Sequence, residues 1–354
     1  MGNNQIIIKF LLFCFLGILP SFAQENDDAK KMGKVTELFS SDTILHVKMT
    51  YANKVIRKNT NDSTYLDKDL TYRIEGDERI SLPVRVRARG KSRLKNCYFA
   101  PLKIKLKKED TKGTLFKGNK ELKLVLPCHT EKAADDYVLK EFLAYKLYEL
   151  ISPYHYKTRL LDIELSEPKG KKVREHRIKG FFIEDIKKVA KRYGGNVLKR
   201  DVHPMQQDAL CSVQNAFFQF MIGNTDFSTA YRHNEKLLFV NKVTVPVPYD
   251  FDMSGLCNTS YSEVSAVGGD VLPITEVTQR MYRGFKRDNE VMLTVRKQFL
   301  DSMPKFMAVI DTYKDHFENP KEYVQCKAYI KGFFDVLSDD SKFKKEILNR
   351  ARTK

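Results

Sequence analysis

The stretch GNTDFSTAYRHNEKLLFVNKVTVPVPYDFD (residues 223–252) contains a predicted β-hairpin, and carboxylates lie before it and at its end. Its polar first part carries Asp226 and, eight positions later, Asn234. Residues 236–252 predict a hairpin whose second strand ends at Asp250 and Asp252. Two acids directly after a strand are compatible with an ordinary strand-ending turn or with a metal site, and the rest of the chain bears on that choice.

Upstream, residues 42–126 are predicted to form mostly strands, because several segments alternate between apolar and polar residues. In PLKIKLKK (101–108), Leu102 and Ile104 would share one face and the lysines the other. The other alternating segments are DTILHVKMTY, LTYRIEG, SLPVRVRARG and KELKLVLP.

From residue 130 the spacing of apolar residues changes from that of a strand to that of a helix. TEKAADDYVLKEFLAYKLYELIS (130–152) predicts a large helix with a leucine stripe and Thr130 as its N-cap. Strands are expected again at 157–166 and 176–185, separated by the turn-rich EPKGKK. A further helix is expected at 203–222, and helices dominate from about 275 to 352.

This order predicts an α+β, two-lobed plan. A mainly antiparallel β N-lobe with one large helix is expected at 42–186. A mostly helical C-lobe with the polar loop and the hairpin is expected at 187–354. Strands and helices do not alternate along the chain as they do in a parallel sheet.

The first 23 residues predict a cleavable signal peptide. A single lysine precedes a short apolar run that ends in Ser21-Phe22-Ala23, and residues 24–41 then read as a polar tether. No other apolar segment approaches the length of a transmembrane helix. We therefore expect an exported protein, periplasmic or extracellular, with no membrane span in the mature chain.

The formal net charge of +17 raises the question of nucleic acid as a partner. The 62 basic residues are scattered among 45 acids and form no basic tail or nucleic-acid-binding motif, so we expect no such partner. Five of the 6 cysteines lie beyond the signal peptide and form no CxxC pair. This pattern argues against a zinc site or a disulfide framework, and leaves room for one unassigned bridge.

The loop and hairpin together have the residues that phosphoryl transfer requires. A carboxylate such as Asp226 can orient or deprotonate the attacking hydroxyl, and Asn234 and Asp250 offer the oxygen ligands that Mg²⁺ prefers. The alternatives are a helix-capping or turn role for Asp226 and a strand-ending turn at Asp250 and Asp252.

The series GNTD…N…DFD, with RARG upstream and LKEFLAYKLYEL between, resembles the CotH-type atypical kinases and the HipA-like kinases. FQFMIGNTDFS and PYDFDMSGL resemble exported Bacteroidetes proteins of that superfamily, and the similarity spans roughly residues 84–258. The resemblance implies a two-lobed kinase-like fold, ATP or another nucleoside triphosphate as donor, and Mg²⁺ or Mn²⁺ as metal.

Residue by residue, the resemblance implies Asp226 as the catalytic carboxylate, with Asn234 and Asp250 as metal ligands and Asp252 assisting. The sequence departs from the kinase pattern in three places, and one of them is that the usual glycine-rich signature over the phosphates is missing. Tyr231 stands where the asparagine is usual, so the loop must bulge or His233 must share the role. DFD also replaces DFG, which leaves open whether Asp250 or Asp252 is the primary ligand.

Nucleotide phosphates are expected near VRVRARGKSR, where Gly90 permits a tight turn and Arg87, Arg89 and Arg93 can bind phosphate oxygens. The alternative is a basic hairpin tip exposed to solvent. Lys103 and Lys105 are both candidates for a phosphate-binding lysine, and solvated surface lysines are the alternative for each.

Two acids complete the predicted nucleotide site. Glu141 is expected to pair with that lysine from the large helix, unless it is an exposed helical acid. Glu184 is expected between the lobes, near the adenine, although a strand-ending acid fits the sequence equally well.

Three functions are consistent with these residues. The first is an exported kinase-like enzyme that transfers a phosphoryl or nucleotidyl group to a protein or small-molecule acceptor. The second is a non-catalytic pseudokinase or scaffold of the cell envelope. The third is a glycosyltransferase that uses Asp250 and Asp252 as a DxD motif, which would require an N-terminal parallel α/β fold that the alternating strands do not indicate. The acceptor, the nucleotide and the oligomeric state are open.

Overall fold

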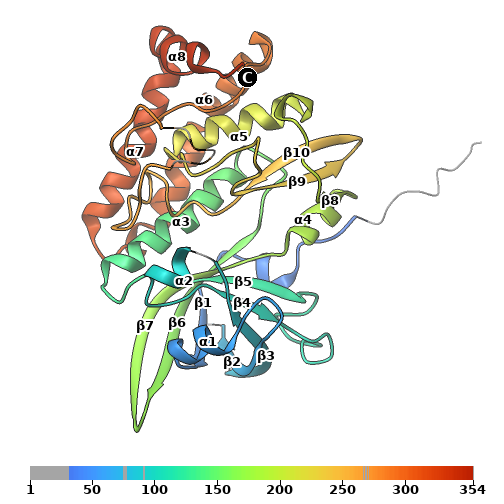
Figure 1. Ribbon diagram of the computed structural model, residues 1–354, viewed down its shortest axis with the longest axis vertical. Coiled ribbons are helices and arrows are strands. Elements are labelled where there is room, and N and C mark those ends of the chain that lie inside the picture. The colour runs from blue at the N-terminus through green and yellow to red at the C-terminus, as the bar shows by residue number, and fades with distance from the viewer. Residues whose placement is uncertain are drawn as a thin grey trace, which may run out of the picture. The chain divides into compact units, whose positions relative to one another are not determined.

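Strands β1 to β7 close into a barrel in the order β1-β2-β3-β4-β5-β7-β6 (Figure 1). The computed structural model describes residues 32–74, 78–90, 92–265, 267, 269 and 271–353, with Ser92 described only as backbone. The strands are β1 (Leu45–Thr50), β2 (Leu66–Arg73), β3 (Ile80–Ala88), β4 (Leu102–Lys105), β5 (Glu121–Val125), β6 (Thr158–Lys169) and β7 (Lys172–Ile183).

Alternation in the sequence produces the two faces of the barrel wall. In β4, Leu102 and Ile104 are fully buried in the barrel core, while Lys103 and Lys105 point outward. β3 and β5 follow the same rule, with Val84 and Val86 inside and Arg85 outside. Removing this apolar surface from water is the main force that holds the barrel together. Short helices α1 (Asn53–Asn59) and α2 (Ser92–Asn96) lie in the connections between strands.

The prediction of a two-lobed kinase-like fold with an antiparallel N-lobe sheet is wrong. The sheet is mixed and closed, because β1 pairs in parallel with β6 as well as antiparallel with β2. Leu45 lies opposite Leu161 and Thr50 opposite Ser166 in this pairing. Alternation shows that a segment is a strand but does not specify a partner more than a hundred residues away, so the closure could not be seen in the sequence.

The hairpin of β6 and β7 is longer than predicted. The segment EPKGKK, expected as a turn, mostly extends the two strands, and only Gly170 and Lys171 connect them. Gly170 has a φ of 62°, which a two-residue hairpin turn commonly requires. The pair projects as the long hairpin in Figure 1.

Helices make up most of the C-terminal part, as the sequence predicts, and a small sheet of order β10-β9-β8 lies beside them (Figure 1). The predicted hairpin is confirmed as β9 and β10, joined by Asn241 and Lys242 with positive φ. The elements are α4 (Ile186–Arg192), β8 (Asn196–Leu198), α5 (Ala209–Met221), β9 (Glu235–Val240), β10 (Val243–Pro248), α6 (Asn289–Thr312), α7 (Pro320–Ser338) and α8 (Asp340–Glu346).

Helix α3 (Ala133–Glu149) is buried on nearly all sides, because it packs against β7 and β6 as well as α6. It is the large helix that the sequence predicts, although it begins at Ala133 rather than next to Thr130. Asp136 in its first turn accepts hydrogen bonds from the amides of Glu318 and Asn319, 2.7 and 3.0 Å long. These bonds attach α3 to the start of α7.

The predicted signal peptide (1–23) lies outside the described residues, as does the first part of the tether (24–31). Within the rest of the tether, a short 3₁₀ helix spans Glu37–Phe39 and buries Leu38 and Phe39 at the barrel.

One disulfide joins Cys97 to Cys128, which are 31 residues apart. Cys97 follows helix α2 directly, and Cys128 follows β5. Cys211, Cys257 and Cys326 are free and buried. The bridge therefore fastens α2 to the end of the barrel strand β5.

Replacing both half-cystines, Cys97→Ala with Cys128→Ala, should lower the free energy of unfolding by about 3–4 kcal/mol, because the cross-link restricts the unfolded chain. Urea unfolding followed by circular dichroism would measure this loss. A reductant should shift the midpoint of the wild type toward that of the double variant and leave the variant unchanged. Equal midpoints for the oxidised wild type and the variant would contradict the prediction.

Candidate functional site

The loop that carries Asp226 folds back from α5 onto the segment that carries Asp250 and Asp252. The Gly255 amide donates a 3.0 Å hydrogen bond to the carbonyl of Gly223, and the Leu256 amide donates to Ile222 at 2.9 Å. Gly223 has a φ of 62°, and a Cβ there would lie 2.0 Å from the Tyr329 hydroxyl. Only glycine fits this turn, which brings the two acidic segments side by side.

Three side chains hold the carboxylate of Asp226. Ser265 Oγ donates to Oδ1 at 2.9 Å, and His233 Nε2 lies 3.2 Å from the same oxygen. Asn234 Nδ2 donates to Oδ2 at 2.9 Å. Burial raises the pKa of Asp226, while His233 acts in the opposite direction. The carboxylate is thus fixed in place and already accepts a hydrogen bond from a hydroxyl group.

Asn234 links this loop to the hairpin. Its backbone has a φ of 53°, and its carbonyl accepts a 3.0 Å hydrogen bond from the Tyr249 amide. Its side-chain nitrogen also donates to the Asp226 carbonyl at 2.7 Å. The path of the loop therefore keeps Asn234 beside Asp226 despite the eight-residue spacing, and His233 contacts Asp226 as well. The role of Asn234 as a metal ligand stays a prediction.

Glu141, Asp250 and Asp252 form a carboxylate cluster, in which one oxygen of each lies within 4.8 Å of the others. Helix α3 positions two of the three carboxylates, because it carries Glu141 and binds the backbone of Asp250. Glu141 is only 1% exposed, and Tyr145, one turn later, accepts a 2.9 Å hydrogen bond from the Asp250 amide. Asp250 itself has a φ of 67°, and this unusual conformation turns its side chain into the cluster.

Phe251 fixes the spacing of the two aspartates. Its ring is fully buried and packs against Tyr145 and Phe218, with ring centroids 4.7 and 5.3 Å apart. The acids on either side of this ring are held in place by the hydrophobic core. Both aspartates of the DFD segment therefore belong to the same cluster.

Arg93 is the counterion of this cluster. Its Nε lies 3.1 Å from Asp252, and a second nitrogen lies 3.9 Å from Glu141. The hydroxyl of Tyr261 accepts a 2.8 Å hydrogen bond from Arg93 and donates one of 3.2 Å to Asp252. Burial would lower the pKa of Arg93, but the surrounding acids raise it well above its ordinary value.

The positive charge of Arg93 does not fully offset the burial of the Glu141 and Asp252 carboxylates. Burial, followed by the nearby Asp252, raises the pKa of Glu141 to about 8, although Arg93 lowers it. Burial also raises the pKa of Asp252. Neither oxygen of Glu141 has a hydrogen-bond partner in the described part of the chain. A buried acceptor without a donor is costly, and a divalent cation would satisfy it.

The donor set fits a hard cation. All the ligand atoms on offer are carboxylate oxygens, which suit Mg²⁺, Mn²⁺ or Ca²⁺ better than zinc. Glu141, Asp250 and Asp252 would hold the ion, with Asn234 nearby on the same hairpin.

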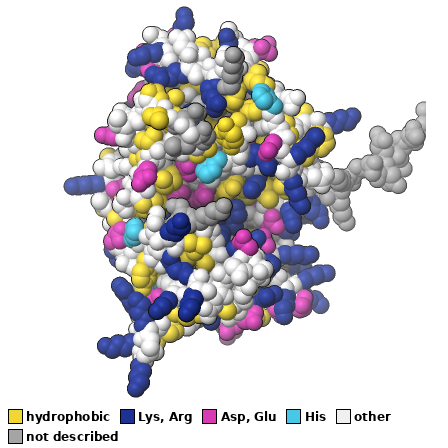
Figure 2. Space-filling model, viewed as in Figure 1, with side chains coloured by type: hydrophobic (Ala, Val, Ile, Leu, Met, Phe, Trp, Pro, Cys, Tyr) yellow, Lys and Arg dark blue, Asp and Glu magenta, His cyan; other side chains and the backbone are white. Residues whose placement is uncertain are grey.

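Lys123 and Arg89 form the basic side of the site. Lys123 lies over the Tyr249 ring, 4.4 Å from its centroid. Burial, and then the charge of Arg89, lowers the pKa of Lys123 to about 7, while Asp250 acts in the opposite direction. Lys103 and Arg87 continue this line across β4 and β3, since they occupy neighbouring register positions. Lys and Arg side chains are dense over the barrel on the face drawn in Figure 2.

The other predicted phosphate-binding residues lie farther along the barrel. Arg87 contacts Asp62 at 2.8 Å and the Tyr65 hydroxyl at 3.1 Å. Lys103 pairs with Glu121 at 2.5 Å, and Lys105 lies over the Tyr65 ring. Gly90 has a φ of 81° in the turn after β3. These residues share the outer barrel face with Lys123 but have partners of their own.

Glu141 has a different partner from the one expected, whereas Glu184 directly follows β7, the strand-ending position that its alternative predicts. Glu141 faces Arg93, Asp250 and Asp252, with no lysine partner among the residues described. Glu184 is 3% exposed, pairs with Arg192 at 2.7 Å and accepts a 2.6 Å hydrogen bond from the Lys157 amide. Its carboxylate is thus engaged in holding α4 against the barrel.

Sequence reasoning missed Lys123, Ser265 and Tyr261. The sequence could have identified Lys123, because the alternation in KELKLVLP places it on the polar face of its strand, the face that also carries Lys103. Ser265 and Tyr261 carry no sequence signal, since they lie in an irregular segment whose path depends on tertiary packing.

Adding Mn²⁺ should stabilise the protein, by about 2.7 kcal/mol at about a hundred times the dissociation constant. Glu141→Gln and Asp250→Asn should each remove most of this gain, because each deletes an anionic ligand. Thermal unfolding with and without MnCl₂ would measure it.

The stability of Glu141→Gln without metal shows whether the substitution itself disturbs folding. A neutral amide is not repelled by Asp252, so the metal-free variant should be at least as stable as the metal-free wild type. Full retention of the Mn²⁺ effect in both variants would show that the cluster is not a metal site.

In the part of the chain that the structure describes, no helix has the length and apolar character needed to cross a membrane. No protein-family model matches the chain, and no curated protein matches it either. The chemistry of the site is therefore the basis for assigning a function.

Proposed function

We propose that the chain is an exported metal-dependent phosphotransferase, which transfers a phosphoryl or nucleotidyl group from a nucleoside triphosphate to a hydroxyl acceptor. One observation carries the proposal: Asp250 of the three-carboxylate cluster is close enough to interact electrostatically both with a fixed fourth carboxylate, Asp226, and with Lys123 on the basic barrel face. Export rests on the predicted signal peptide at 1–23.

Each part of this arrangement has a role in such a reaction. Glu141, Asp250 and Asp252 would hold Mg²⁺ or Mn²⁺, which when bound neutralises charge on phosphate oxygens. Lys123 and Arg89 offer cations to the same phosphates, and binding a phosphate would favour the charged form of Lys123.

Asp226 is suited to receive the proton of the acceptor. Its burial raises its pKa, which makes it a stronger base than an exposed aspartate. Ser265 Oγ donates to Oδ1 at 2.9 Å, which is the hydrogen bond that an acceptor hydroxyl would make. As the oxygen–phosphorus bond forms and the diphosphate or pyrophosphate leaves, the hydroxyl proton would pass to Asp226.

A non-catalytic binding module is the second candidate, and the position of Arg93 favours it. The guanidinium lies within ion-pair distance of both Asp252 and Glu141, so the cluster has a resident cation. A protein that only binds would keep this ion pair closed when metal and nucleotide are supplied.

Asp226→Asn and Asp250→Asn should each reduce transfer from γ-labelled ATP at least about a hundredfold, since one removes the base and the other a metal ligand. Intact mass spectrometry after incubation with ATP, GTP or UTP and Mg²⁺ or Mn²⁺ would detect transfer to the protein. Asp301→Asn, an exposed carboxylate on α6, is the matched control and should leave transfer unchanged.

Three results would count against the proposal. Transfer by both variants at the wild-type rate would place the reaction elsewhere. Absence of transfer from every nucleotide, with or without metal, would favour the binding module. Turnover of UDP-sugars in place of ATP would assign Asp250 and Asp252 to a glycosyltransferase.

Lys123→Met should raise the KM for the nucleotide at least about tenfold, because the variant loses a partly buried cation beside the phosphates. Lys105→Met is the matched control on the same barrel face, and it should change the KM less. Steady-state kinetics over a nucleotide titration would compare the two. A larger effect at Lys105 would move the phosphate subsite toward Tyr65.

A further inference from the structure

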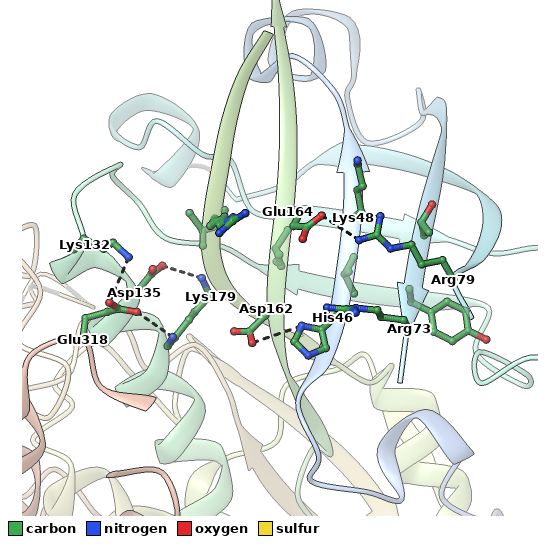
Figure 3. A pocket seen from close by; sticks show the side chains of 16 residues that line it. His46, Lys48, Arg73, Arg79, Lys132, Asp135, Asp162, Glu164, Lys179 and Glu318 are labelled. Carbon is green, nitrogen blue, oxygen red and sulfur yellow. Dashed lines mark hydrogen bonds and ion pairs between the residues drawn. The ribbon is translucent and has the colours of Figure 1, made fainter. Parts of the chain in front are cut away.

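A groove of about 400 Å³ lies on the outer surface of the barrel, across β2, β1, β6 and β7. The start of α3 and Glu318, just before α7, form one wall (Figure 3). Asp135 lines the groove six residues before Glu141 on α3, but no residue of the carboxylate cluster lines it.

Two cross-strand rows of side chains form the base of the groove. The strand register places Arg73, His46, Asp162 and Lys179 in one row and Thr71, Lys48, Glu164 and Arg177 in the next. Neighbouring positions in such a row are about 5 Å apart. Each row therefore presents an acid from β6 flanked on both sides by residues of β1 and β7.

The two central acids are held loosely. Asp162 lies 3.8 Å from His46, and Glu164 lies 3.8 Å from Arg79, both beyond hydrogen-bond distance (Figure 3). Their side chains are 45% and 44% exposed. These carboxylates are free to accept hydrogen bonds from a ligand.

Cations exceed acids in the groove. Six Lys and Arg side chains line it, against four Asp and Glu. Lys179 and Lys132 are matched by Glu318 at the wall, at 3.2 and 3.4 Å. Lys48, Arg73 and Arg177 are exposed and have no ion-pair partner among the residues that the structure describes. The groove thus offers acceptors at its centre and unmatched cations on either side.

We propose that this groove binds an oligosaccharide that carries carboxylates, such as a chain of uronic acids. Sugar hydroxyls would donate to Asp162 and Glu164, and the sugar carboxylates would pair with Arg73, Arg177 and Lys48. A single ligand then uses both the acceptors and the surplus cations.

Other ligand classes leave part of the groove unused or opposed. A polyphosphate or an acidic peptide lacks the sugar hydroxyls that would donate to Asp162 and Glu164, and so it would meet these two acids with like charge. A neutral sugar would not use the surplus cations. An apolar ligand would find little surface, because Val47, Tyr72 and Ile163 beneath the groove are 2%, 3% and 4% exposed.

An extended peptide is also disfavoured by the barrel. Peptides commonly bind sheets by adding a strand to a free edge. β2, β1 and β6 are paired on both sides, whereas β7 pairs with β5 only at Phe181–Ile183 and has β6 as its one described strand partner beside the groove. At that place the Lys179 amide already donates a 2.9 Å hydrogen bond to Asp135. Recognition in the groove therefore uses mainly side chains, which suits a hydroxyl-rich ligand.

Isothermal titration calorimetry with trimers of galacturonate, glucuronate and mannuronate tests the proposal on the full mature chain. At least one trimer should bind with a dissociation constant below about 1 mM. Arg73→Gln with Arg177→Gln should weaken that binding at least about tenfold. Lys172→Gln with Arg174→Gln removes the same charge from β7 outside the groove, and it should change binding less than about twofold.

Asp162→Asn with Glu164→Gln separates specific recognition from simple charge attraction. The uronate trimer should lose at least about tenfold in affinity, because its hydroxyls lose charged acceptors. Polyglutamate should instead bind the same variant more tightly than it binds the wild type, because repulsion is removed. Circular dichroism melting curves that match the wild type would confirm that these variants are folded.

Three outcomes would overturn the proposal. One is the absence of binding by every trimer at about 1 mM. Another is unchanged or stronger uronate binding after the loss of Asp162 and Glu164. The third is tighter binding of an alternating Glu-Lys peptide than of any uronate. None of these measurements depends on nucleotide or metal, so the result is independent of the proposed phosphotransferase activity.

Discussion

The burial of the Glu141 carboxylate beside Asp252 is the constraint on which the site depends. Moving a carboxylate out of water costs several kcal/mol unless other charges compensate it. Arg93 provides part of this compensation, at 3.1 Å from Asp252 and 3.9 Å from Glu141. Cys97, four residues after Arg93, is cross-linked to Cys128, so the disulfide helps to hold the counterion over the acids. A core with only a structural role does not need these buried charges, and hydrophobic residues in their place would cost less free energy of folding.

The topology explains how such distant residues meet. Helix α3 runs between the barrel and the C-terminal helices, and it brings Glu141 and Tyr145 to the end of β10 (Figure 1). Strand β5 carries Lys123 to the same place from the barrel side. The turn at Gly223 then adds Asp226 from α5. The site therefore forms only when the barrel and the helical part pack together, which couples its geometry to the global fold.

The sequence predicted local features well and long-range ones poorly. Period-two alternation identified the barrel strands and the β9–β10 hairpin, because inward and outward residues differ in burial. It could not identify the parallel pairing of β1 with β6, so a closed mixed barrel was predicted as the mainly antiparallel sheet of a kinase-like N-lobe. The acids at 226, 250 and 252 were singled out because they follow a predicted helix and a predicted strand, and the structure brings Asp250 and Asp252 into one cluster. The position of Glu141 was misjudged, since a mid-helix acid is normally exposed, and here α3 is buried on almost every side.

The basic composition of the chain follows from the same geometry. A closed barrel needs apolar residues only inside, and outward positions such as Arg85, Lys103 and Lys105 are free to be charged. Some of these cations have acidic partners of their own, such as Asp67 beside Arg85 and Glu121 beside Lys103. Other acids are grouped in two places, the cluster at Asp250 and the groove at Asp162. A bare polyanion would be attracted by the barrel surface and repelled at both places. Ligands that bring their own cation or their own hydrogen-bond donors avoid this repulsion. The net charge of +17 is therefore a poor guide to partners, whereas the position of the acids in these two places discriminates between possible ligands.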